Sequence, residues 1–90
     1  MLQLKRLVLD VLKPHQPDVL EFARAIAARG AGYRVTLTVL EMDEKTETLE
    51  VVIEGANVEL EVIVSTINEL GASLHSIDVV EVVNVGSENA

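Results

Sequence analysis

The chain contains no cysteine and no tryptophan, and it has only one phenylalanine and one tyrosine among its 90 residues. Without cysteine it has no disulfide framework, no thiolate nucleophile and no cysteine-based zinc or iron–sulfur site. The core that its 49% hydrophobic residues supply is therefore filled mainly by valine, isoleucine and leucine. A chain of this length makes one domain and leaves no room for a second core.

Positive charge is also scarce, with seven lysines and arginines against fifteen acidic residues and a net charge of −8. Because affinity for nucleic acid comes mainly from cationic contacts to phosphate, this balance argues against a nucleic-acid partner. The charges are unevenly spread, since residues 1–34 hold six of the seven cations and residues 35–90 hold twelve of the acids. Such a split suits charge pairing within the chain, a contact between subunits, or a solvated acidic surface that maintains solubility.

Long apolar runs are absent as well. The first six residues lead into a charged, alternating segment, which predicts neither a signal peptide nor a membrane span, and a cytoplasmic location is expected. The last residues, 84–90, are small and polar, and we expect them to form a flexible tail on a domain that covers residues 1–83.

Hydrophobic periodicity predicts six elements of secondary structure. In chain order they are a strand over 5–13, a helix from Pro17 to a left-handed stop at Gly30, strands over 33–42 and 47–54, a helix from 59 to 70, and a strand over 72–83. Residues 58–62 alternate like a strand, but the longer 3.6-residue period from Leu60 to Leu70 favours a helix. The last strand does not alternate cleanly, which indicates a β-bulge or burial on both faces by something outside the domain.

The order strand, helix, strand, strand, helix, strand predicts the α+β ferredoxin-like βαββαβ sandwich. Right-handed crossovers give an antiparallel sheet in the order 4-1-3-2 with both helices on one face. The other face is left bare, and an apolar patch with a polar rim there indicates a subunit interface, the alternative being a solvated face with a few tolerated aliphatic residues. The aliphatic residues expected on it are Val8, Leu12, Leu40, Met42 and Val52.

Several activities known for this fold are excluded by the residues. An RNA-recognition domain needs aromatic side chains on its two central strands, and the first and third strands have none. A metallochaperone needs a Cys-x-x-Cys pair, and an acylphosphatase needs a glycine-rich loop with an arginine where this chain has residues 13–17.

One candidate site lies at the loop after the first strand. Prolines at 14 and 17 stiffen the segment, which presents His15 and Lys13 beside the free backbone amides of the first helix, where a small anion can bind. Asp18 lies in the same turn, so a surface histidine beside a capping acid is the alternative.

A second candidate group is His75 with Ser76 and Asp78. The predicted strand order places the start of the last strand beside the end of the first, near Asp10 and His15. Two histidines and two carboxylates at such distances suit a divalent metal ion, although an ordinary hydrogen-bonded surface pair is the alternative.

The candidates can be grouped by role. The metal candidates are Asp10, His15, His75 and Asp78, and the candidates for other small ligands are Lys13, His15 and Ser76. No catalytic residue is assigned, because neither a nucleophile elbow nor an oxyanion donor supports a Ser–His–Asp triad. The acidic residues at 41, 43, 44 and 47 are interpreted as a solvated hairpin turn, since the glycine and spacing of an EF-hand loop are missing.

Two segments carry a family resemblance. Residues 8–17, Val-Leu-Asp-Val-Leu-Lys-Pro-His-Gln-Pro, resemble the Leu-Asp-x-Leu-Lys-Pro-His-x-Pro signature of the archaeal domain of unknown function 211. Residues 71–78, Gly-Ala-Ser-Leu-His-Ser-Ile-Asp, are similar to that family's Gly-x-Ser-Ile-His-Ser-x-Asp segment. The resemblance implies a ferredoxin-like fold, an archaeal cytoplasm and a symmetric homo-oligomer, and it implies no activity.

These observations lead to two functional hypotheses. The first is a non-enzymatic homo-oligomeric module that binds a small anion or a metal ion near the loop after the first strand and the start of the last. The alternative is a small metal-dependent enzyme that uses the histidine and aspartate cluster. One small subunit has little concave volume for a substrate, so the first hypothesis is preferred.

Overall fold

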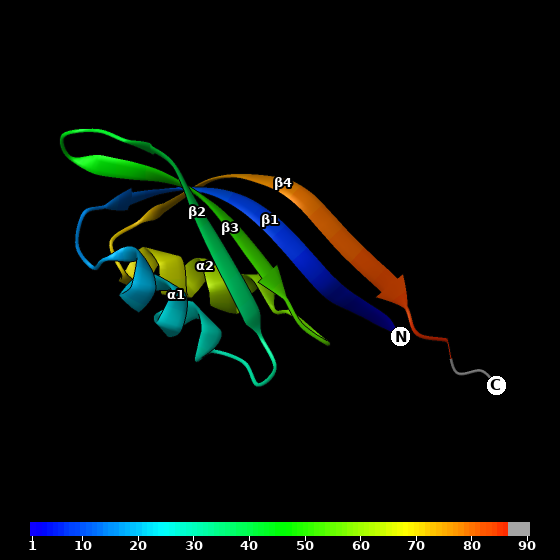
Figure 1. The fold of residues 1–90 in the computed structure, drawn as a ribbon. Helices are drawn as coiled ribbons and strands as arrows, with labels where there is room; N and C mark the ends of the chain where they lie inside the picture. The colour runs from blue at the N-terminus through cyan, green and yellow to red at the C-terminus, as the bar shows by residue number, and fades with distance from the viewer. Residues whose placement is uncertain (87–90) are drawn as a thin grey trace.

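The computed structural model describes residues 1–86 and has the predicted order of elements (Figure 1). They are β1 (Leu2–Pro14), α1 (Val19–Ala27), β2 (Arg34–Met42), β3 (Thr46–Glu54), α2 (Leu60–Glu69) and β4 (Ser73–Asn84). Asn84, the first residue of the predicted tail, ends β4, and residues 87–90 of that tail lie outside the described residues. No helix within residues 1–86 is long and apolar enough to span a membrane.

The four strands form one antiparallel sheet in the order β2-β3-β1-β4, and both helices lie against the same face of it (Figure 1). The predicted ferredoxin-like fold and its 4-1-3-2 strand order are therefore confirmed. We call the face that carries the helices the helix face and the opposite one the open face.

The core lies between the helix face and the two helices. It is made almost entirely of aliphatic side chains with no exposed surface, and Phe22 is its only aromatic member among the described residues. The fully buried apolar members are Leu7, Leu9, Val11, Phe22, Ile26, Leu49, Val51, Ile53, Ile63 and Ile67. Burial of each such side chain contributes about 1.5–3 kcal/mol, so the regular alternation on β1 and β3 is sufficient to fix which face points inward.

The start of α1 differs slightly from the prediction. Asp18 is the N-cap, and its side chain accepts a hydrogen bond from the Glu21 amide at 2.9 Å, so Pro17 precedes the cap and does not take the first helical position. The left-handed residue after the helix is Gly32, with φ of 80°, and not Gly30.

Gly30 is required for a different reason. A Cβ atom at this position would lie 2.4 Å from Cζ of Tyr33, so the tyrosine ring packs directly on the glycine. The Tyr33 hydroxyl in turn accepts a hydrogen bond from the Glu59 amide at 3.0 Å, at the first turn of α2. Gly71, with φ of 82°, follows the C-cap Leu70, so α2 ends where the predicted helix 59–70 does.

The predicted irregularity of the last strand is confirmed. The pairing of β1 with β4 shifts register at three points, where Lys5 on β1 and His75 and Asp78 on β4 are the extra residues. Five of the six aliphatic residues of β4 are exposed, while Leu74 is half-buried against the core; the exposed ones are Ile77, Val79, Val80, Val82 and Val83.

A further register shift changes one expectation for the open face. The pairing of β2 with β3 shifts at Leu40, so Met42 lies opposite Glu47. Because directly opposed residues of a sheet share a face, Met42 belongs to the helix face and its predicted place on the open face was wrong. Val8 and Val52 are paired neighbours on the open face, as predicted.

The sheet extends beyond its helices at one end. The last pair between β1 and β3 is Arg6 and Glu54, and the Leu4 carbonyl still accepts from the Val58 amide at 2.8 Å, so residues 2 and 3 are the part of β1 that pairs with β4 alone. This two-stranded ribbon projects away from α1 and α2 (Figure 1), and the Val85 amide closes its end by donating to the Met1 carbonyl at 2.7 Å.

Candidate functional site

Lys13 is a fully buried lysine at the end of β1. It continues the alternation of Leu9 and Val11, so its side chain enters the helix face. The Nζ atom donates to the carbonyls of Pro14 at 2.7 Å, of His15 at 3.4 Å and of Pro17. An ammonium group has three protons, and these three backbone acceptors account for all of them.

Glu47 lies directly opposite Lys13 in the pairing of β1 with β3, and its side chain is 9% exposed. Its Oε1 atom is 3.1 Å from Nζ of Lys13, and its Oε2 atom is 2.9 Å from Nδ1 of His15. Oε1 is buried, and its contact is the ion pair with Lys13. The carboxylate thus holds one cationic side chain on each oxygen.

His15 is placed so that both ring nitrogens face acceptors. Nδ1 faces the Glu47 carboxylate, while Nε2 lies 3.0 Å from the Asp43 carbonyl and 3.1 Å from the Glu44 carbonyl. A neutral imidazole carries one proton, so only the imidazolium satisfies both sides. The hydrogen bond to Glu47 accordingly raises the pKa of His15, and the same bond lowers the pKa of Glu47.

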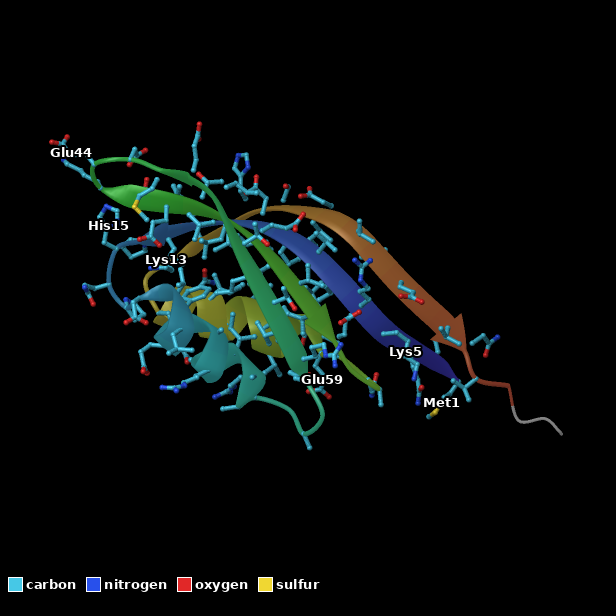
Figure 2. All side chains as sticks on the ribbon, in the orientation of Figure 1. Met1, Lys5, Lys13, His15, Glu44 and Glu59 are labelled. Atoms are coloured by element: carbon cyan, nitrogen blue, oxygen red, sulfur yellow. The ribbon has the colours of Figure 1, made fainter. Side chains whose placement is uncertain are left out.

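These contacts tie two loops together at one end of the molecule. Figure 2 shows His15, in the loop after β1, directly beside Glu44 at the tip of the β2–β3 hairpin. The tip is itself ordered by Asp43, whose Oδ1 atom accepts from the amides of Lys45 and Thr46 and from the Thr46 hydroxyl. The hydrogen bond from the Thr46 amide is the main cause of a lowered pKa for Asp43. Lys13 and His15, the two candidates for an anion site, are thus already bound within the chain.

The second pair of candidates lies on the open face. Asp10 and His75 are 3.2 Å apart, from Oδ2 to Nδ1, and His75 reaches Asp10 from the extra position of a bulge in β4. The side chain of His75 is 78% exposed. The second oxygen of Asp10, Oδ1, is shielded from solvent and has no hydrogen-bond partner. Leu12 and Thr48 complete a cavity of about 250 Å³ around this pair.

Ser76 and Asp78 form a third small contact, with the Ser76 hydroxyl donating to Oδ1 of Asp78 at 2.8 Å. Ser76 lies opposite Asp10 in the pairing of β1 with β4, so it borders the Asp10–His75 pair. Asp78 occupies the other bulge of β4.

The structure therefore places the predicted residues in separate groups. Asp10 and Lys13 lie on opposite faces of β1, so the Asp10–His75 pair and the Lys13–Glu47–His15 network do not share a site. Within residues 1–86 no three histidine, aspartate or glutamate side chains come close enough together to hold a metal ion. Asp10 and His75 are the metal candidates that are brought into contact.

Glu47 is the central residue that sequence reasoning did not single out, because it was assigned to a solvated acidic turn. A signal for it was present: Glu47 has the same alternation as Leu49, Val51 and Ile53, which point inward. Lys13 likewise continues the alternation of the inward residues Leu9 and Val11 on β1. Alternation alone therefore puts an acid and a base on the helix face of the sheet.

Comparison with known proteins places the chain in a family. The family model of domain of unknown function 211, described as an uncharacterized ArCR family, matches residues 5–87. The uncharacterized protein MJ0319 of Methanocaldococcus jannaschii is 40% identical over 75 residues, which cover 83% of this chain and 77% of that protein. The resemblance noted at both histidine segments is thus confirmed over nearly the whole domain, and the chain belongs to the domain of unknown function 211 family.

Proposed function

We propose that the protein is a non-enzymatic homo-oligomeric module whose subunits associate along the free edge of β4, and that it binds a divalent metal ion beside Asp10 and His75. The observation that carries the assembly is the exposure of β4. Val80 and Val82 are 58% and 55% exposed, and they lie on the helix face beyond the cover of the helices.

The edge of β4 has little of the usual protection against pairing: its two β-bulges, at His75 and Asp78, and its two acids, Asp78 and Glu81, are what protects it. The strand is twelve residues long, Ser73–Asn84, and contains no lysine, arginine or proline. Solvent-exposed edge strands of natural proteins are commonly kept short or protected by such residues, because a long apolar edge offers unpaired amides and carbonyls to another strand. A second strand along β4 would satisfy these groups and cover the exposed valines.

The ion-binding part of the proposal is supported by the Asp10–His75 pair. An imidazole nitrogen and a carboxylate oxygen are common ligands of divalent transition metals. The pair borders a cavity, the histidine is accessible, and the shielded Oδ1 atom of Asp10 has no partner. A cation is favoured over an anion because the basic candidates Lys13 and His15 are bound to Glu47. An enzyme that used all four metal candidates would need them in one place, so we propose binding rather than catalysis.

Assembly is tested by native mass spectrometry and light scattering on untagged protein at micromolar concentration. We expect an oligomer, and a monomer would contradict the proposal. Val80→Lys should weaken association at least about tenfold, because it places a charge on the strand edge. Leu20→Lys is the matched control, since Leu20 is 56% exposed on α1, and it should leave the oligomer unchanged.

Ion binding is tested by calorimetric titration with Zn²⁺ and Ni²⁺. We expect stoichiometric binding that weakens at least about tenfold in His75→Ala and in Asp10→Asn, as loss of one ligand from a metal site does. His15→Ala, which removes the other histidine, should keep the wild-type affinity. Equal affinity in His75→Ala and wild type would rule out the site.

A further inference from the structure

We infer that β4 of one copy pairs with β2 of the next, so that a single antiparallel sheet continues from subunit to subunit. This inference rests on the proposed association along β4 and specifies its partner strand. We call a row the set of directly opposed residues, one from each strand, that runs across the sheet. The inference follows from which residues stand at the two ends of each row, on the free edges of β2 and β4.

One row of the open face alternates in charge across all four strands. From β2 to β4 it consists of Arg34, Glu54, Arg6 and Glu81, each directly opposite the next. Within it Nε of Arg6 lies 3.6 Å from Oε2 of Glu54. The row ends in a cation on the β2 edge and in an anion on the β4 edge, so the two edges are complementary in charge.

The rows of the helix face end in aliphatic residues at both edges. From β2 to β4 they contain Val35, Ile53, Leu7 and Val80 in one row and Leu37, Val51, Leu9 and Ile77 in the next. The members on β3 and β1 are fully buried, whereas Ile77 and Val80 on the β4 edge are 44% and 58% exposed. Ile77 and Val80 therefore lack, on the outer side of β4, the neighbouring strand that covers the corresponding residues of β1 and β3.

The strand directions allow β2 to be that neighbour. β4 runs antiparallel to β1, and β1 and β2 both run antiparallel to β3, so β4 is antiparallel to β2 as well. With the helices of both copies on the same side, β2 of the next copy continues the antiparallel pattern. In the register that prolongs the rows, Glu81 meets Arg34, Val80 meets Val35, and Ile77 meets Leu37 of the next copy.

Pairing of β4 with β4 is less favourable. The strand carries Asp78 and Glu81 and no lysine or arginine, so a two-fold contact between identical β4 edges brings acids together without a cation from either strand. The β4-to-β2 contact joins different surfaces of the two copies, so it builds a closed ring or an open filament. Neither assembly leaves an unpaired β4 edge inside it.

The charge complementarity is tested with two single variants and their mixture. Arg34→Glu and Glu81→Arg each place like charges across the junction and should weaken association at least about tenfold. When the two variants are mixed, each β4 edge meets a β2 edge of opposite charge, so oligomers should form again. The controls Arg29→Glu and Glu61→Arg make the same changes of charge at exposed positions away from both strands and should associate normally. Two variants that associate like wild type would overturn the β4-to-β2 contact.

A second test does not depend on charge or on the folding of the charge variants. The chain has no cysteine, so Arg34→Cys combined with Glu81→Cys introduces the only two thiols. Within one chain these positions are three strand spacings apart, about 14 Å, which is too far for a disulfide. Under mild oxidation we expect a covalent ladder of subunits on a denaturing gel from the double variant and none from either single variant.

The outcomes separate this inference from the proposed function. Disulfide-linked dimers from Glu81→Cys alone would show β4 paired with β4; they would overturn the β4-to-β2 contact and leave association along β4 standing. A wild-type protein that is monomeric at micromolar concentration would overturn both.

Discussion

Lys13 and Glu47 face each other across β1 and β3, and both side chains point into the protein instead of into solvent. An ion pair removed from water is favourable only when its remaining hydrogen-bonding groups are satisfied. Here the backbone of residues 14–17 satisfies the lysine, and His15 satisfies one oxygen of the glutamate. The loop after β1 thus folds over the Lys13–Glu47 ion pair, and the role of Lys13, His15 and Glu47 that these contacts indicate is structural.

Removal of the lysine should be strongly destabilising. Lys13→Met leaves Glu47 buried with one cationic partner in place of two, and we expect a loss of about 3–5 kcal/mol in the free energy of unfolding. Lys45→Met, at an exposed position of the hairpin turn, should change it by no more than about 0.5 kcal/mol. Urea unfolding monitored by circular dichroism measures both, and equal stability of the two variants would contradict the buried ion pair.

The His15–Glu47 bond should make stability depend on pH in a defined window. The raised pKa of His15 contributes stability that is complete below its ordinary value of 6.5 and is lost as pH rises through the raised value. The lowered pKa of Glu47 contributes stability that is complete above 4.5 and is lost as pH falls through the lowered value. The difference in Tm between wild type and His15→Gln should therefore be greatest between about pH 4.5 and 6.5 and smaller at pH 8 to 9. A difference that grows above pH 7 would show that the imidazolium is not the stabilising form.

Gly30 should be sensitive because of the Tyr33 ring. Gly30→Ala places a methyl group 2.4 Å from the ring and must displace it, together with the hydrogen bond from Glu59 to the tyrosine hydroxyl. We expect a loss of about 1–3 kcal/mol, as for overpacking elsewhere. In a Tyr33→Ala background the same substitution should cost little, so a double-mutant cycle of unfolding free energies measures the coupling. Additive effects would show that the ring does not hold this position.

Asp18 should act through the helix cap. Asp18→Ala removes the hydrogen bond to the Glu21 amide and should lower the free energy of unfolding by about 1 kcal/mol, whereas Asp18→Asn retains a capping oxygen and should lower it less. Thermal unfolding of the three proteins gives the comparison. Alanine and asparagine variants of equal stability would argue that the charge of Asp18, and not its cap, is what matters.

The regular parts of this fold could be predicted because one signal dominated each of them. Alternation from Leu49 to Ile53 and the helical stripe that includes Phe22 and Ile26 identify the inward faces by periodicity alone. The error within the sheet arose where one extra residue changes the face. The shift at Leu40 carried Met42 to the helix face, because a single inserted residue reverses a period of two.

The candidate sites were less predictable for a related reason. Strand order placed the start of β4 beside β1 and so suggested the contact of His75 with Asp10. It did not reveal that His15 turns toward Glu47, since that contact depends on the path of the 14–17 loop and on the carbonyls of the hairpin tip. Sequence order limits which segments can be neighbours, whereas backbone carbonyls at their ends decide where a histidine side chain lies.

The ribbon of β1 and β4 that extends past the helices implies a gradient of local stability along the sheet. Amides of Leu9 and Val11, between β3 and β4 and beneath the helices, should exchange with solvent deuterium only when the whole domain unfolds. Those of residues 2 and 3 lie where β4 is the one neighbouring strand of β1, and they should exchange through local opening. The end of the sheet with the least protection also carries exposed valines, so any partner that covers it would slow hydrogen exchange there first.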